Sequence, residues 1–215
     1  MALKAKICGV NSRVAAEAAV AGGAAFVGLV FYPPSPRNVT PAEAEAVAAA
    51  VPPSVTRVGL FVDAEDAVVE AAVTAAGLGM LQLHGGETPA RVAALRKHFG
   101  LPVMKAIPIA SAADVAAAEA YLGVADWLLF DAKPPPAMAN ALPGGNALRF
   151  DWTLIAGRRW PLPWMLSGGL DAANLAEAVR ISGAAVVDVS SGVEDRPGHK
   201  DPARIAAFLA AAKAL

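Results

Sequence analysis

The feature that most constrains the fold of this 215-residue chain is a repeated unit of one strand-like run and one helix-like stretch. The runs are rich in β-branched and aromatic residues, and alanine-rich stretches separate them. The intervals between runs cluster near about 25 residues, the length of one strand, one helix and two short loops. Eight runs occur, and we place their ends near Cys8, Phe31, Phe61, His84, Ile107, Asp131, Ser167 and Ser190.

The number of units decides between two architectures. An open doubly wound sheet can share this rhythm, but eight successive units in a chain this short favour closure into a barrel. No stretch has the composition of a linker or a domain boundary. We therefore predict an α/β protein in which residues 1–215 form a single-domain (β/α)8 TIM barrel.

Helix signals support this phasing. Thr40, Pro41 and Glu43 read as an N-cap, a proline at the first helical position and a capping-box glutamate. Asp201 and Pro202 repeat the first two of these features before the last helix. The stretches 64–76 and 202–214 alternate apolar and polar residues at helical spacing, so that one face can pack on the barrel.

Composition excludes several classes of partner. The formal net charge is -1 and no basic stripe is present, so we expect no nucleic-acid partner. The apolar runs are broken by Gly, Pro or charge, and the start has no apolar core of a signal peptide, so we expect no membrane association and a cytoplasmic location. One cysteine and three histidines without metal-ligand spacing predict neither an intramolecular disulfide nor a metal site. Monomer and homodimer both stay open.

Two glycine-containing turns follow the seventh and eighth predicted strands. The first contains Gly168 and Gly169, and the second contains Ser190, Ser191 and Gly192. Glycines let backbone approach a ligand closely, and the helix predicted after the first turn can aim N–H groups at an anion. Loops at these positions of a barrel commonly hold phosphate. A structural role in tight turns is the alternative, but two turns at these places favour a phosphorylated small-molecule substrate.

Two strand ends offer groups for proton transfer. Asp131 ends the apolar run 127–131, where desolvation favours a protonated carboxyl that can act as a general acid; a turn cap is the alternative. Cys8 ends the first strand, where it is either a buried apolar residue or a base. A base needs an accessible thiolate and a nearby cation. Lys6, two residues back on the same pleat face and about 7 Å away, is the candidate.

Further groups lie at the same end of the predicted barrel. Arg37 closes a loop stiffened by three prolines, where its guanidinium could hold a carboxylate through two parallel hydrogen bonds; a solvated surface charge is the alternative. His84 is open between substrate contact and a structural hydrogen bond. The irregular stretch 132–149, rich in Pro and Gly, is predicted to be a loop lying over the site.

Taken in order, these motifs resemble those of the phosphoribosylanthranilate isomerase family of tryptophan biosynthesis. The matching fragments run nearly the full length of the chain, and their joint occurrence in this order is highly specific. They are Lys6-Ile7-Cys8-Gly9, Phe31-Tyr32-Pro33-Pro34-Ser35-Pro36-Arg37, Gln82-Leu83-His84-Gly85, Phe130-Asp131, Ser167-Gly168-Gly169-Leu170, Asp188-Val189-Ser190-Ser191-Gly192-Val193-Glu194, Pro197-Gly198 and Lys200-Asp201.

The resemblance implies an Amadori rearrangement of N-(5-phosphoribosyl)anthranilate to 1-(2-carboxyphenylamino)-1-deoxyribulose 5-phosphate, with no metal or organic cofactor. It implies that Asp131 is the general acid that opens the furanose ring and that Cys8 is the base that removes the C2 proton. Arg37 would hold the anthranilate carboxylate. The two turns would hold the phosphate through Gly168, Gly169, Ser190, Ser191 and Gly192.

One segment departs from the family pattern, and two other functions stay open. Where the family usually reads Gly-Gly-Thr-Gly, this chain has Gly144-Gly145-Asn146-Ala147, which leaves the shape of the loop open. A related phosphoribosyl-sugar isomerase, such as that of histidine biosynthesis, would be expected to use paired carboxylates, so Cys8 argues against it. A phosphosugar-binding barrel without activity would be expected to have lost Cys8 or Asp131, and both are present.

Overall fold

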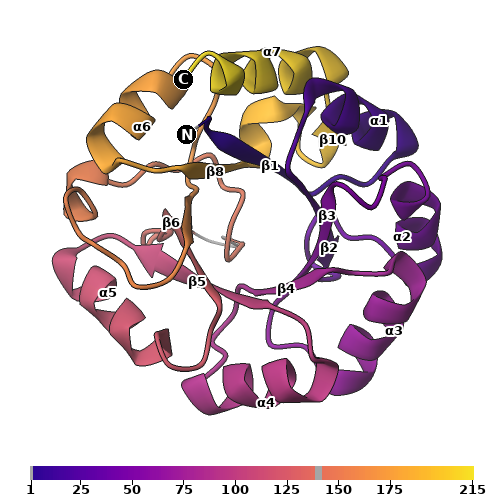
Figure 1. Ribbon diagram of the computed structural model, residues 1–215, viewed down its shortest axis with the longest axis horizontal. Helices are drawn as coiled ribbons and strands as arrows, with labels where there is room; N and C mark the ends of the chain where they lie inside the picture. Colours follow the sequence, from indigo (N-terminus) through magenta and orange to yellow (C-terminus); the bar gives the residue numbers. More distant parts are fainter. Residues whose placement is uncertain (1, 139–141) are drawn as a thin grey trace.

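The computed structural model describes residues 2–138 and 142–215, and its centre is a closed barrel of eight parallel strands. Each strand pairs with its neighbours in chain order, and β1 closes the barrel against β8 (Figure 1). The predicted strand ends all fall within two residues of the observed ones. The strands are β1 (Lys4–Cys8), β2 (Phe26–Phe31), β3 (Thr56–Phe61), β4 (Met80–Leu83), β5 (Val103–Ile109), β6 (Trp127–Ala132), β7 (Trp164–Leu166) and β8 (Val186–Val189).

The helices form a ring outside the barrel (Figure 1). They are α1 (Arg13–Gly22), α2 (Pro41–Ala48), α3 (Asp66–Ala76), α4 (Pro89–Phe99), α5 (Ala112–Ala117), α6 (Leu175–Ser182) and α7 (Pro202–Lys213). A short 3-10 helix, η1 (Ala118–Tyr121), extends α5. The predicted (β/α)8 barrel is therefore confirmed. The alanine-rich composition of these helices suits close packing on the strands, because a small side chain lets a helix axis approach the sheet.

The sixth unit departs from the expected strand-plus-helix pattern. Between β6 and β7 the described residues hold only the 3-10 helix η2 (Trp152–Leu154) and irregular backbone. Pro134 to Pro136 and Pro143 cannot donate the backbone hydrogen bonds of a helix interior, and glycines follow them. The loop predicted over 132–149 is thus present, although its residues 139–141 lie outside those that the structure describes.

The predicted helix caps are confirmed. The Thr40 side chain accepts a hydrogen bond from the Glu43 N–H, and the Glu43 carboxylate accepts one from the Thr40 N–H. Asp201 caps α7, and Pro202 is its first residue. The start of α3 is predicted two residues early, since its N-cap is Glu65.

The apolar core has two main layers. The larger lies between the strands and the helix ring and includes Ile7, Leu81 and Phe208, all fully buried. The second fills the barrel interior with Val58, Met104 and their neighbours. Towards the carboxyl ends of the strands, polar side chains replace apolar ones in the barrel interior. The groups that can react with a ligand therefore lie at that end of the barrel.

Two features complete the fold. A small antiparallel hairpin, β9 (Glu194–Arg196) and β10 (His199–Lys200), follows the 3-10 helix η3 (Ser191–Val193) and was not predicted. Within residues 2–138 and 142–215, no helix is long and apolar enough to cross a membrane.

Candidate active site

A cavity of about 460 Å³ opens at the carboxyl ends of the strands. Its walls mix apolar side chains with a few polar groups, as the walls of small-molecule sites do. Cys8, Arg37, His84, Asp131 and Ser190, each predicted from the sequence, line it together.

A smaller cavity of about 330 Å³ adjoins the first. Gly168, Gly169 and Ser191 line it, and it shares Asp131 and Ser190 with the larger cavity. The structure thus brings nearly all of the predicted residues to one place.

Cys8 lies on the wall of the larger cavity with its thiol almost fully buried. Lys6 points into the barrel beside it, as the shared pleat face predicted: a Cβ built on Gly28 would lie 3.0 Å from Cys8 Sγ and 3.1 Å from Lys6 Nζ. The Cys8 thiol and the Lys6 ammonium therefore both lie beside Gly28, which has no side chain to exclude them. A side chain at position 28 would displace one of them.

The charges around Cys8 act in opposite directions. Burial raises the pKa of the Cys8 thiol, the Lys6 ammonium lowers it, and Asp188 raises it. Burial alone would lower the pKa of Lys6, but Asp188 and Cys8 raise it to about 12. Lys6 therefore stays charged at neutral pH. The net effect is a raised pKa of the thiol, with the Lys6 ammonium in place to stabilise a thiolate.

Asp188 is held on both of its oxygens. Its Oδ1 lies 2.9 Å from Lys6 Nζ, and its Oδ2 accepts a hydrogen bond from Ser167 Oγ at 3.2 Å. Lys6 and Asp188 are opposite each other in the β1–β8 register. A buried carboxylate with both oxygens engaged is a poor candidate for a proton acceptor, because it would have to give up these partners.

Asp131 lies on β6, buried, with its carboxyl group between two donors. Its Oδ1 accepts a hydrogen bond from the Ala132 N–H at 2.8 Å, and its Oδ2 lies 3.2 Å from His84 Nε2. The other ring nitrogen of His84 lies 2.9 Å from Gln82 Nε2. Gln82 thus orients the imidazole, and the imidazole orients the carboxyl group. His84 makes the structural hydrogen bond that the sequence offered as one alternative. It also lines the cavity, and its contact with a substrate stays a prediction.

The two glycine turns adopt conformations that suit an anion. Gly168 and Gly169 have φ of 91° and 60°, which a residue with a Cβ rarely adopts. The N–H groups of Gly168, Gly169 and Ser190 donate to no acceptor within residues 2–138 and 142–215. These donors face a cavity rather than a protein carbonyl, the pattern of a backbone anion site.

Two details of the turns differ from expectation. The N–H groups of Ala173 and Asn174, before α6, both donate to Asp171 Oδ1, so this helix start does not aim them at an anion. Gly192 lines neither cavity, and a Cβ there would collide with the carbonyl oxygen of Leu170. Close packing therefore explains this glycine.

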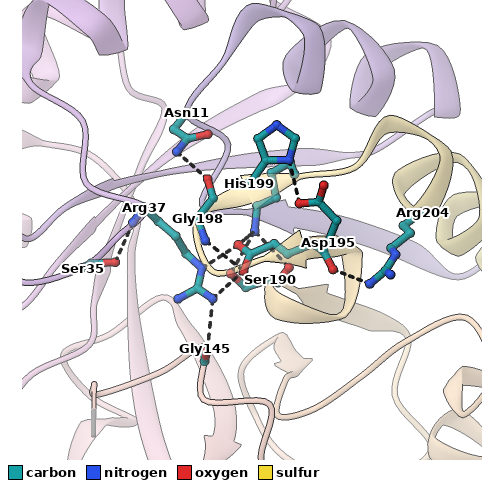
Figure 2. A network of polar contacts seen from close by, with 11 residues as sticks. Asn11, Ser35, Arg37, Gly145, Ser190, Asp195, Gly198, His199 and Arg204 are labelled. Atoms are coloured by element: carbon teal, nitrogen blue, oxygen red, sulfur yellow. Dashed lines mark hydrogen bonds and ion pairs between the residues drawn. The ribbon is translucent and has the colours of Figure 1, made fainter. Parts of the chain in front are cut away.

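Arg37 is buried at the edge of the larger cavity, so the alternative of a solvated surface charge is excluded. Its Nε and Nη2 each donate to one oxygen of Glu194 at 2.8 Å, and Nη2 also donates to the Gly145 carbonyl at 3.1 Å. Figure 2 shows the guanidinium between Gly145 and the β9–β10 hairpin. The sequence predicted that Arg37 donates two parallel hydrogen bonds to a substrate carboxylate. At the Nε and Nη2 edge, Arg37 donates these two bonds to the Glu194 carboxylate instead.

The loop after β6 covers the cavity, as predicted. A Cβ built on Gly144 would lie 2.8 Å from Asp131 Oδ2 and 2.9 Å from His84 Nε2, so this backbone passes directly above the carboxyl–imidazole pair. Asn146 accepts a hydrogen bond from the Leu142 N–H and donates one to its carbonyl. Ala147, where the family pattern has glycine, has a φ of 55°.

The sequence of this chain matches those of known proteins over nearly its full length. The family model described as N-(5'phosphoribosyl)anthranilate (PRA) isomerase matches residues 5–211. The N-(5'-phosphoribosyl)anthranilate isomerase of Rhodospirillum centenum is 60% identical over 215 residues, which cover 100% of both chains. That of Paramagnetospirillum magneticum is 58% identical over 99% of this chain and 98% of its own. The chain belongs to the N-(5'-phosphoribosyl)anthranilate isomerase family.

Solved structures of phosphoribosylanthranilate isomerases share the fold. The Thermotoga maritima enzyme superposes with a TM-score of 0.87 at 34% identity, covering 99% of this chain and 100% of its own. Another, at a TM-score of 0.82 and 33% identity over 99% of this chain and 100% of its own, was solved in complex with reduced 1-(o-carboxyphenylamino)-1-deoxyribulose 5-phosphate. The resemblance read from the motifs, and the isomerase function that it implies, are confirmed.

The sequence reasoning gave no role to four residues that the isomerase site contains. Asp188 and Ser167 line the cavity beside Cys8. Glu194 and Lys200, both buried, support Arg37 and Ser190 from the hairpin. Lys6 and Asp188 are opposite charges in neighbouring apolar strands, so their pairing could have been predicted from the sequence. No local sequence pattern indicated a role for Glu194.

Proposed function

We propose that this chain converts N-(5-phosphoribosyl)anthranilate into 1-(2-carboxyphenylamino)-1-deoxyribulose 5-phosphate, with Asp131 as the acid and Cys8 as the base. The observation that carries these roles is the cavity itself. A carboxyl group and a thiol line it on different strands, with a guanidinium at one edge and unbonded backbone N–H groups in the adjoining pocket.

In the first step, Asp131 gives a proton to the furanose ring oxygen while the bond between C1 and that oxygen breaks. The electron pair of the anthranilate nitrogen forms the C1–N double bond, giving a protonated Schiff base. His84 lies beside this acid, with its Nε2 3.2 Å from Asp131 Oδ2, and orients the carboxyl group.

In the second step, the Cys8 thiolate removes the proton from C2, and the electron pair moves into a C1–C2 double bond while the iminium nitrogen becomes neutral. The resulting enolamine then gains a proton at C1 and loses one from the C2 hydroxyl, which leaves the ketone. Cys8 is the better base in this cavity than Asp188, because Lys6 and Ser167 already engage both Asp188 oxygens.

Binding groups lie on either side of these two residues. Arg37 would take the anthranilate carboxylate, and the turns with Gly168, Gly169, Ser190 and Ser191 would take the phosphate. The relative solved with a reduced product analogue supports this assignment, since that compound carries both groups. No cofactor is needed, because the steps consist of proton transfers and the cleavage of one C–O bond within the substrate, with no external oxidant or reductant. We place the reaction in the cytoplasm, with no nucleic-acid or membrane partner, by a monomer or homodimer.

The test is turnover of phosphoribosylanthranilate by the purified chain, followed as loss of its fluorescence. We expect saturable turnover with a kcat in the range of ordinary metabolic enzymes, on the order of 1–100 per second. No loss of fluorescence at substrate concentrations well above micromolar would refute the proposed reaction. Growth of a tryptophan auxotroph that lacks this isomerase, with the chain supplied in trans, is the matched test in cells.

A further inference from the structure

The β9–β10 hairpin carries two buried charges that face the site. Glu194 and Lys200 are 5% and 4% exposed, whereas their hairpin neighbours Asp195 and His199 are exposed and pair with each other. Figure 2 shows Asp195 beside His199, and a separate set of contacts that converges between Arg37 and Ser190. Removing two charges from water costs free energy even when they pair with each other. A role of Glu194 and Lys200 in the site would explain why they are buried.

Glu194 controls which part of the Arg37 guanidinium can meet a ligand. It occupies the Nε and Nη2 edge with two bonds of 2.8 Å, and the Gly145 carbonyl takes a second hydrogen of Nη2. The hydrogens of Nη1 are the donors that the described residues leave unused. Ligand carboxylates can therefore approach along the Nη1 side, and the rigid fork fixes that direction.

The same carboxylate reaches the phosphate turn through Lys200. Lys200 Nζ lies 2.6 Å from Glu194 Oε1 and donates to the Ser190 carbonyl and hydroxyl at 2.9 and 3.2 Å. Its three donors are thus engaged. Burial lowers the pKa of Lys200 to about 8, although Glu194 raises it, so this ammonium depends on Glu194 for its charge.

When Lys200 is protonated, the three buried groups carry one unbalanced positive charge: Arg37 and Lys200 are cations and Glu194 is the anion between them. An unbalanced buried charge is unfavourable in the empty cavity, and one ligand carboxylate at Nη1 would neutralise it. The arrangement therefore favours a ligand with a single carboxylate at this edge and a separate anionic group at Ser190.

We propose that Glu194 is a positioning residue that gives the enzyme its selectivity for a substrate bearing a carboxylate beside the anthranilate nitrogen. It turns Nη1 of Arg37 into the cavity and, through Lys200, fixes that guanidinium relative to the phosphate turn. This inference rests on the proposed function.

The experiment compares two substrates, phosphoribosylanthranilate and the analogue made from aniline, which lacks the carboxylate. Glu194→Gln should reduce the ratio of their kcat/KM values at least about tenfold, through a higher KM for the carboxylate substrate, because the fork is no longer held. Glu194→Asp, which keeps the charge, should recover part of the preference. Asp195→Asn, on the outer side of the hairpin, is the matched control and should leave both substrates unchanged.

Two further variants keep the test decisive. Glu194→Gln combined with Lys200→Met removes both members of the ion pair and should show the same loss of preference, even if the single variant folds poorly. In an Arg37→Ala background, Glu194→Gln should have no further effect on the preference. An unchanged preference in the variants, or a fall in kcat at constant KM, would overturn the inference. Failure of the unmodified chain to turn over phosphoribosylanthranilate would instead refute the proposed function.

Discussion

The floor and the roof of the cavity are built in different ways. The floor consists of Lys6, Cys8, Asp131 and Asp188, which are fixed by strands β1, β6 and β8. The roof consists of Arg37 and residues 142–147, which belong to loops and are held by contacts such as the bond from Arg37 to the Gly145 carbonyl. Proton transfer needs atoms placed to within a fraction of an ångström, which strands provide better than loops. We therefore expect the chemical steps to depend on the floor and substrate binding to depend on the roof.

The largest effects are expected from removing the proton-transfer groups of the floor. Cys8→Ala and Asp131→Asn should each lower kcat at least about 10²-fold, the usual contribution of a general acid or base. Steady-state fluorescence kinetics measures this, with circular dichroism as the control for folding. A change confined to KM in either variant would contradict this division of roles, because it would show that the residue binds substrate and does not transfer a proton.

The roof should show the opposite kinetic pattern. Arg37→Ala should raise KM by about 10- to 100-fold, which corresponds to one charge-assisted contact of about 1.5–3 kcal/mol, and should change kcat much less. Arg37→Lys keeps the charge without the fork and should fall between. Arg180→Ala, an exposed arginine on α6, is the control. An unchanged KM in Arg37→Ala would contradict the binding role.

The electrostatics of the floor can be read directly because Cys8 is the only cysteine of the chain. Lys6 lowers the pKa of the Cys8 thiol and Asp188 raises it, so Lys6→Met should move the thiol titration to higher pH and Asp188→Asn to lower pH. The rate of thiol alkylation as a function of pH, followed by mass spectrometry, gives both midpoints. Shifts in the same direction would exclude Lys6 and Asp188 as opposing influences.

The smallest effect concerns backbone strain in the roof. Ala147 has a φ of 55°, so Ala147→Gly should raise the free energy of unfolding by about 0.5–1 kcal/mol. Ala71→Gly, at an exposed position in the middle of α3, should lower it by about 1 kcal/mol because glycine disfavours a helix interior. Denaturant unfolding of the two variants checks the opposite signs. Destabilisation by Ala147→Gly would show that this conformation is not strained.

The floor is also the part that the sequence predicts well. Strand ends recur with the period of the fold, so Cys8 and Asp131 could be assigned to one end of the barrel before any coordinates. Lys6 could be placed beside Cys8 from the alternation of side chains along a strand. Asp188 was open to the same argument, since a lone charge in the apolar run of β8 has to find a partner.

The roof was beyond local reasoning because its contacts join distant segments. Arg37 and Glu194 are 157 positions apart, and Arg37 and Gly145 are 108 apart. No periodicity links a proline-rich loop to a hairpin at the other end of the chain. The sequence therefore predicted that Arg37 binds an anion, but not that Glu194 already occupies one edge of it.

The central claim, that Asp131 and Cys8 serve different proton transfers in sequence, is tested most directly with substrate deuterated at C2. Single-turnover rates for protiated and deuterated substrate would be compared in the unmodified enzyme and in the two floor variants. In Cys8→Ala, cleavage of the C2–H bond should limit the rate and the isotope effect should be large. In Asp131→Asn, ring opening should limit the rate and the isotope effect should fall towards one. Equal isotope effects in the two variants, or the reverse order, would contradict the assignment of acid and base.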